Sequence, residues 1–89
     1  MKFIMLVKDK KVPTKQSTAR VTKMLGELEK KSIKMLGFYW TLGRCDYVMI
    51  FEAPTEKDAL KLALDIKEDV TTETLVAVPR EEALKLLRA

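Results

Sequence analysis

The residues best suited to chemistry in this sequence lie close together, between positions 39 and 46. Tyr39 and Trp40 are adjacent aromatic residues, and Arg44 and Asp46 carry opposite charges around a predicted turn. Tyrosine and tryptophan combine a large apolar surface with one hydrogen-bonding group, which suits the wall of a ligand pocket. A carboxylate beside them can anchor a polar ligand, or act as a base if burial raises its pKa. We take four residues as a candidate ligand pocket: Tyr39, Trp40, Arg44 and Asp46.

Each of these residues also has a purely structural interpretation, which we favour over the functional one. Tyr39 and Trp40 point to opposite faces of one predicted strand and can serve packing alone. Asp46 follows a turn, where aspartates commonly accept hydrogen bonds from nearby backbone N–H groups. Arg44 is then a solvated charge or a partner of Asp46. No catalytic residue is assigned.

Missing residue types narrow the chemistry further. The sequence has no histidine, which removes Ser-His-Asp and Cys-His catalysis and the usual zinc, copper and non-haem iron sites. Cys45 is the only cysteine, so no internal disulfide is possible, and we expect a packed thiol rather than a reactive one. We therefore expect neither a metal nor a cofactor.

The apolar pattern predicts the elements that position this stretch. Apolar residues recur at helical spacing in Val21, Met24, Leu25 and Leu28, and Thr55 with Asp58 resembles a capping box. We predict strands at 2–8, 33–42, 46–52 and 71–78, and helices at 15–31, at 55–67 and after Pro79. This order is the ferredoxin-like βαββαβ arrangement of an α+β fold, with a short C-terminal helix, in a single domain spanning 1–89.

Both faces of the predicted sheet are apolar, which indicates an oligomer. Phe3, Met5 and Val7 alternate with Ile4 and Leu6 in the first strand, and the third strand repeats this pattern. Two long helices cover only one face, and an uncovered apolar face is unusual in a monomer. The alternative is a monomer in which the short terminal helix covers part of the second face. We expect a homodimer or higher homo-oligomer that joins its sheets face to face.

Charge and composition suggest where the protein works. Residues 1–44 hold 11 Lys and Arg against 3 Asp and Glu, a balance of +8, and residues 45–89 hold 6 against 10, a balance of −4. A basic half can bind nucleic acid, but pairing with the acidic half needs no further partner, so we rank RNA or single-stranded DNA binding low. Without a signal peptide or membrane-spanning run, we expect a cytoplasmic protein that does not bind a membrane. The abundance of Lys and Glu, with no Asn, fits a thermophile.

The central stretch resembles the GYD domain family. Residues 37–54 read Gly-Phe-Tyr-Trp-Thr-Leu-Gly-Arg-Cys-Asp and then a hydrophobic strand that ends Glu-Ala-Pro, and residues 72–75 and 79–82 resemble the family's final strand and tail. The family pattern has a Tyr-Asp pair where this chain has Cys45 and Asp46. Any role of that tyrosine hydroxyl therefore does not carry over to this chain.

The resemblance implies a fold and an assembly more than an activity. The family is similar to other dimeric α+β barrel proteins, which include cofactor-free oxygenases and ligand-sensing domains, and it has no settled biochemical role itself. We expect an oligomeric ligand-binding or regulatory protein with a small-molecule ligand. The alternative is a cofactor-free oxygenase or isomerase, which lacks support because histidine and one tyrosine are missing.

Overall fold

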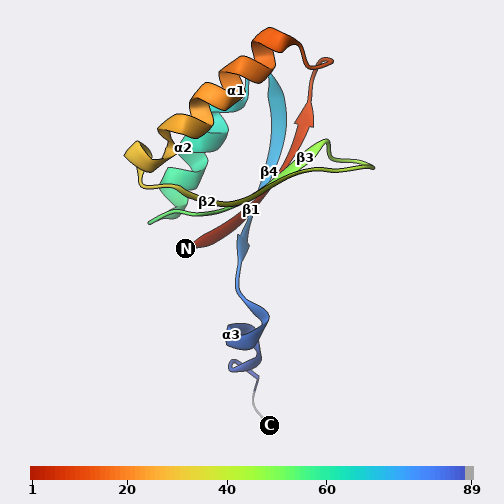
Figure 1. Cartoon of the computed structure of the whole chain (residues 1–89). Coiled ribbons are helices and arrows are strands. Elements are labelled where there is room, and N and C mark those ends of the chain that lie inside the picture. The colour runs from red at the N-terminus through yellow and green to blue at the C-terminus, as the bar shows by residue number, and fades with distance from the viewer. Residues whose placement is uncertain (88–89) are drawn as a thin grey trace.

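The computed structural model describes residues 1–87 and shows a four-stranded antiparallel sheet with two long helices on one side (Figure 1). The elements are β1 (Lys2–Asp9), α1 (Lys15–Glu27), a 3₁₀ turn (Leu28–Lys31), β2 (Lys34–Trp40), β3 (Tyr47–Glu52), α2 (Glu56–Ile66), β4 (Val70–Ala77) and α3 (Arg80–Leu84). The strands lie in the order β2-β3-β1-β4. This confirms the ferredoxin-like α+β fold; residues 88 and 89 of the expected domain lie outside the described part.

Capping boxes with side-chain hydrogen bonds mark the start of both long helices. The Thr14 N–H donates to Ser17 Oγ over 2.8 Å, and the Ser17 N–H donates to Thr14 Oγ1 over 3.1 Å. Asp58 accepts from the Thr55 N–H over 3.0 Å, as the predicted capping box requires. The predicted helix 15–31 is shorter than expected, because α1 ends at Glu27 and the chain tightens into the 3₁₀ turn.

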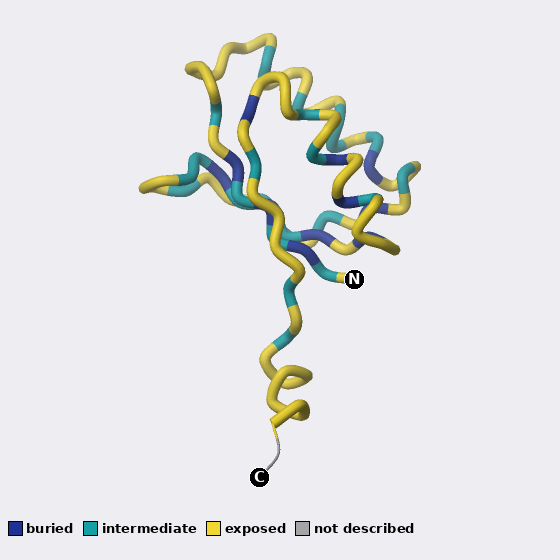
Figure 2. Tube along the Cα trace, turned by 180° about the vertical axis from the view of Figure 1, so that it is seen from behind, coloured by how far each residue is buried: buried dark blue, intermediate teal, exposed yellow. Residues whose placement is uncertain are grey.

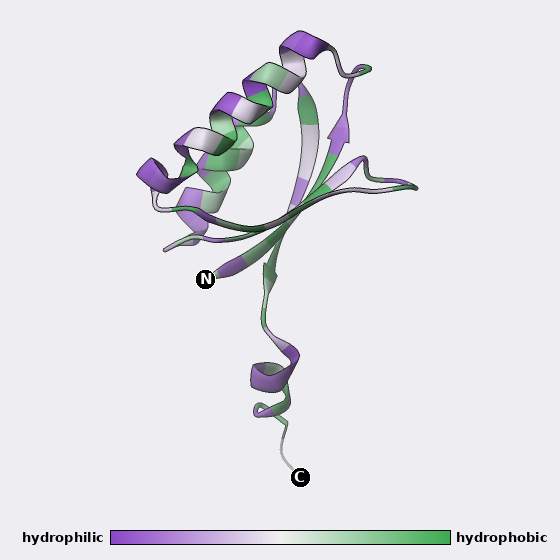
Figure 3. Cartoon of the chain, viewed as in Figure 1, coloured by the Kyte–Doolittle hydropathy of each residue, from purple (hydrophilic) through white to green (hydrophobic). Residues whose placement is uncertain are grey.

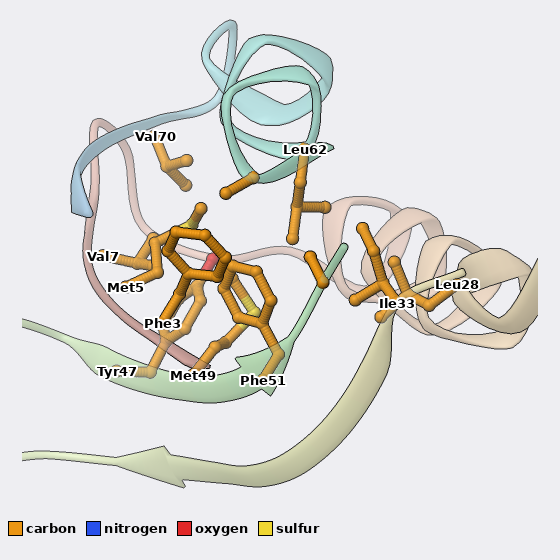
Figure 4. Close-up of a cluster of buried hydrophobic side chains, with 12 residues drawn as sticks. Phe3, Met5, Val7, Leu28, Ile33, Tyr47, Met49, Phe51, Leu62 and Val70 are labelled. Atoms are coloured by element: carbon orange, nitrogen blue, oxygen red, sulfur yellow. The ribbon is translucent and has the colours of Figure 1, made fainter. Parts of the chain in front are cut away.

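The core lies between the helices and one face of the sheet (Figure 4). Alternate residues of the two central strands point into it: Phe3, Met5 and Val7 from β1, and Tyr47, Met49 and Phe51 from β3. The rings of Phe3 and Phe51 stack with centroids 5.4 Å apart. The second helix, α2, adds buried Ala59 and Leu62. Most of the apolar burial that stabilises the fold is therefore on this face.

On the opposite face of the sheet, which we call the open face, no helix of residues 1–87 lies over the strands (Figures 1 and 2). Strand pairing sets its side chains in rows. One row joins Gly37, Ile50, Ile4 and Leu75; the next joins Tyr39, Val48, Leu6 and Glu73; charged Lys34, Glu52 and Lys2 lie beyond the first. The open face thus has an apolar centre and charged borders.

The terminal helix α3 stands away from the sheet and from the other helices (Figure 1). Its first turn is hydrophilic, and the residues after it are hydrophobic except for Lys85 (Figure 3). Leu84, Leu86 and Leu87 are all exposed. Within residues 1–87, α3 therefore does not cover the open face as the monomeric alternative required. None of the described helices is long and apolar enough to cross a membrane.

Candidate functional site

A hollow of about 200 Å³ lies between α1 and the sheet. The residues of α1 that line it carry mostly short side chains: Ser17, Thr18, Val21, Thr22 and Leu25. None of the α1 residues is fully buried, so this helix sits less closely on the sheet than α2 does. A second hollow of about 140 Å³ adjoins the first and shares Val21, Phe38 and Tyr47 with it. The larger one is called the α1 hollow below.

Three aromatic rings line the α1 hollow on the side of the sheet. Trp40 of β2 pairs with Tyr47 of β3, and Phe38 lies on the same face one pair further along. The ring centroid of Tyr47 is 5.1 Å from that of Phe38 and 5.3 Å from that of Trp40. Trp40 is 66% exposed and Tyr47 only 6%. The three rings thus run from the molecular surface into the core.

Tyr47 is the most buried polar group of this site. Figure 4 shows its side chain rising from β3 beside Met49, toward the helices. No described side chain or backbone group in residues 1–87 forms a hydrogen bond with its hydroxyl. Burial, followed by the charges of Asp9, Asp46 and Asp69, raises the Tyr47 pKa to about 12. The phenol therefore stays protonated near neutral pH and offers a hydrogen-bond donor to the hollow.

Three aspartates meet beside this phenol because of the strand topology. In the antiparallel sheet the end of β1 lies next to the starts of β3 and β4, and Asp9, Asp46 and Asp69 occupy these three positions. The Asp9 N–H donates to Asp46 Oδ2 over 2.6 Å, and the Lys10 N–H donates to the Asp69 carbonyl over 3.1 Å. Asp9 and Asp69 line the α1 hollow, whereas Asp46 holds the strand ends together.

The charges of these aspartates are only partly balanced. Asp69 pairs with Arg20 over 3.2 Å, in an ion pair that is more than half exposed on both sides. Burial, and then the negative charges of Asp46 and Asp69, raise the pKa of Asp9, while Lys8 acts in the opposite direction. Among the described residues, no three Asp, Glu or Cys side chains are arranged to hold a metal ion. The site is therefore an acidic rim around aromatic rings.

The structure separates the four residues that the sequence grouped. Trp40 lines the α1 hollow. Asp46 is next to it but accepts a backbone hydrogen bond, the structural role expected of an aspartate beside a turn. Arg44 is exposed in the loop between β2 and β3. Tyr39 is 58% exposed on the open face, and its ring lies over Gly37, where an added Cβ would come within 2.8 Å of Tyr39 Cε2.

Sequence reasoning missed Asp9, Phe38, Tyr47 and Asp69 as residues of this site. Alternation was the available signal, because Phe38 and Trp40 share one face of β2. Which residue of the next strand lies beside them depends on the length of the loop 41–46. Within this loop the Thr41 hydroxyl donates a hydrogen bond to the Cys45 carbonyl over 2.7 Å. Cys45 is a half-buried free thiol in that loop. Asp9 and Asp69 are 60 positions apart and meet only through the sheet.

Comparison with known proteins gives a family and no close relative. A family model described as the GYD domain matches residues 4–87 of the 89-residue chain. No curated protein matches the chain significantly, and no solved structure does so either. The match begins within β1 and includes all the later elements through α3.

Proposed function

Since the chain belongs to the GYD domain family, which carries no assigned activity, we propose its function from the site: a homo-oligomeric domain that binds a small molecule in the α1 hollow. One observation carries this proposal. Tyr47 is a mostly buried residue, yet its hydroxyl forms no hydrogen bond with the described residues and stays accessible where the helix leaves the sheet incompletely covered. A ligand can satisfy this donor and fill the space.

Two features of this place favour the binding of a ligand. Protein interiors are packed about as densely as organic crystals, yet the smaller hollow reaches the core residue Met49 and both hollows reach Tyr47. The Tyr47 hydroxyl has no described partner, and since no buried side-chain nitrogen or oxygen of the described residues lacks one, this hydroxyl is accessible to a ligand. Concave, mostly apolar spaces with a few polar groups are the usual form of ligand sites. At about 140 and 200 Å³ the hollows are smaller than the roughly 300–1,000 Å³ of typical ligand pockets, which favours a small ligand.

Fluorescence tests the proposal directly, because Trp40 is the only tryptophan and lines the α1 hollow. The protein is titrated with small neutral aromatics, aliphatic alcohols, carboxylates and amines. At least one class is expected to change the Trp40 emission in a saturable way. Val21→Phe, which fills the hollow from α1, should abolish the change, and Leu60→Phe on the exposed side of α2 should not.

The experiment has a clear negative outcome. If no class of fragment changes the Trp40 emission, or if Val21→Phe binds as well as the unchanged protein, the α1 hollow is not a binding site. Loss of binding in both Val21→Phe and Leu60→Phe would point to general damage to the fold. Circular dichroism of both variants checks that α1 and α2 remain folded.

The oligomeric part of the proposal rests on the open face. Its apolar rows centre on Ile4, Ile50 and Leu6, and charged residues of both signs border them. An apolar core with a polar rim is the usual anatomy of a protein interface. A second copy of the chain covers this face best, because two such sheets pack together about 10 Å apart. Light scattering at low micromolar concentration should give at least twice 10.2 kDa.

The alternatives receive less support from the same geometry. An oxygenase or isomerase that uses Asp46 as a base needs its carboxylate free, but that carboxylate accepts the Asp9 N–H and does not line the α1 hollow. Single-stranded nucleic acid needs stacking aromatics on a basic open sheet face. Tyr39 is the one aromatic residue in the rows of the open face, and Glu52 and Glu73 lie among its lysines.

A further inference from the structure

We infer that the ligand of the α1 hollow is a small organic cation of the substituted-ammonium class. The inference rests on the proposed function, because it names the ligand chemistry of that same hollow. Its basis is the combination of two carboxylates, three aromatic rings and the hydroxyl of Tyr47 around one space. The carboxylates and the aromatic rings favour positive charge, the Tyr47 hydroxyl can form a hydrogen bond with a polar group of the same ligand, and these groups come from different elements of the fold.

The charge of the lining is one-sided. Asp9 and Asp69 line the α1 hollow, and none of the described residues that line it is Lys or Arg. This is notable in a chain with 17 Lys and Arg against 13 Asp and Glu. The Asp9 carboxylate forms no ion pair with any described residue. A second carboxylate, that of Asp46, is close to it, because it accepts a hydrogen bond from the Asp9 N–H. Arg20 already pairs with Asp69 from outside the lining, so Asp9 is the carboxylate to which an incoming cation would bring a balancing charge.

The aromatic rings fit the same class of ligand. Cations are attracted to the faces of aromatic rings, most strongly tryptophan, and sets of such rings recognise quaternary ammonium groups. The ring centroid of Tyr47 lies 5.1 Å from that of Phe38 and 5.3 Å from that of Trp40, and all three residues line the hollow. A ligand seated here would contact rings on the side of the sheet and Asp9 at the rim.

Metal ions and anions fit this arrangement less well. Small hard cations need several oxygen ligands at short distance, and the described carboxylates are not arranged in that way. An anion would meet the charges of three nearby aspartates, the same charges that help to raise the Tyr47 pKa. An organic cation spreads its charge over a larger volume, so it can interact with a distant carboxylate and with ring faces together.

The test compares choline with the uncharged alcohol in which carbon replaces its quaternary nitrogen. Both are titrated into the full chain at constant ionic strength, with Trp40 fluorescence as the readout. Choline is expected to bind at least about tenfold more tightly than the alcohol, as a cation–π contact with a carboxylate nearby would give. The two probes have the same shape, so the ratio of their affinities reports charge alone.

Variants connect this ratio to the rim. Asp9→Asn removes the charge but keeps the backbone N–H that bonds to Asp46, so the fold should be retained. It is expected to weaken choline about fivefold or more and to leave the alcohol unchanged; Asp69→Asn should act in the same direction. Glu29→Gln, an exposed carboxylate in the 3₁₀ turn that does not line the hollow, serves as the matched control.

The outcomes separate this inference from the proposed function. Equal binding of choline and the alcohol, unaffected by Asp9→Asn, overturns the cation class and leaves a binding site for neutral molecules. A choline response that Glu29→Gln reduces as much as Asp9→Asn reflects the overall charge of the protein, and it also overturns the inference. If neither these probes nor any fragment class changes the Trp40 emission, the inference and the proposed function both fail.

Discussion

Phe51 and Ile50 are neighbours on β3, but they face two different environments. Phe51 is completely buried under the helices and stacks on Phe3, whereas Ile50 lies on the open face beside Ile4. Both side chains are large and apolar, and their strand alternates normally. The difference arises only because both long helices lie on one side of the sheet (Figure 1). One face is therefore complete within the chain, and the other still exposes apolar surface.

This comparison indicates what each face does. The helix-covered face stabilises the chain through its core and holds the α1 hollow at its edge. The open face adds nothing comparable within one chain, so its apolar rows are better explained by contact with a second copy. Substitutions on the two faces should consequently differ in kind: one set affects folding, the other association.

Truncation of Phe51 should have the largest effect. Phe51→Ala removes a fully buried ring and with it the stacking contact with Phe3. This should cost about 3–5 kcal/mol of unfolding free energy. The midpoint of urea unfolding should fall by the same amount at every protein concentration. For Ile50→Ala the loss of unfolding free energy should shrink as the protein is diluted. Dilution separates the subunits by mass action, so contacts made across the open face then no longer contribute to stability. Equal, concentration-independent losses in both variants would contradict the division between the faces.

A charge at the centre of the open face should separate the subunits. Ile4 lies between Ile50 and Leu75, so Ile4→Lys places an ammonium group in the middle of the proposed interface. Burial of an unpaired charge is costly, and association should weaken by roughly a hundredfold or more. Light scattering should then give the single-chain mass of 10.2 kDa with unchanged helix content. Leu60→Lys on α2 is the control and should leave the mass unaffected.

Much of the fold follows from the sequence, because alternation and helical spacing are local signals. Phe3, Met5 and Val7 are correctly placed on one face, and the Thr55–Asp58 cap begins α2 as predicted. The site is harder to predict, because it depends on which strand ends meet and on how closely α1 approaches the sheet. Neither is a local property. The sequence therefore predicts Trp40 as a residue of the site, whereas it predicts its neighbour Tyr47 only as part of an apolar strand.

Removal of the C-terminal arm, residues 80–89, tests whether the open face is covered from within the chain. Because α3 stands away from the sheet and Leu84, Leu86 and Leu87 are exposed, the monomer should lose less than about 0.5 kcal/mol of stability. Its exposed leucines are expected to contact the second copy, so deletion should weaken association about tenfold. Analytical ultracentrifugation measures both the mass and this constant. A large loss of monomer stability would mean that the arm folds back over the sheet.

Gly37 provides a gentler test of the open face. An added Cβ would approach Tyr39 Cε2 to 2.8 Å, so Gly37→Ala should push this ring away from the sheet rather than disturb the backbone. The unfolding free energy should change by less than about 1 kcal/mol, since removing glycine from a strand offsets part of the strain. Association should weaken about threefold, and the change should disappear in a Tyr39→Ala background. If it persists there, the ring does not mediate it.

Asp9→Asn should produce the smallest change, and its sign depends on pH. The pKa of Asp9 in the folded protein is raised above its ordinary value of 3.8, by burial and by Asp46 and Asp69, with Lys8 opposing. The folded state therefore binds more protons than the unfolded state between 3.8 and the raised pKa, and stability falls as the pH increases through that range.

At neutral pH the charged Asp9 therefore costs stability, and Asp9→Asn should slightly raise the midpoint of thermal unfolding there. At pH values below 3.8, where Asp9 is protonated in both states, the same substitution should have almost no effect. Glu29→Gln is the control at each pH. A lower midpoint for Asp9→Asn at neutral pH would mean that the carboxylate stabilises the fold. A gain would instead fit a charge retained at the rim of the hollow for binding, at the expense of stability.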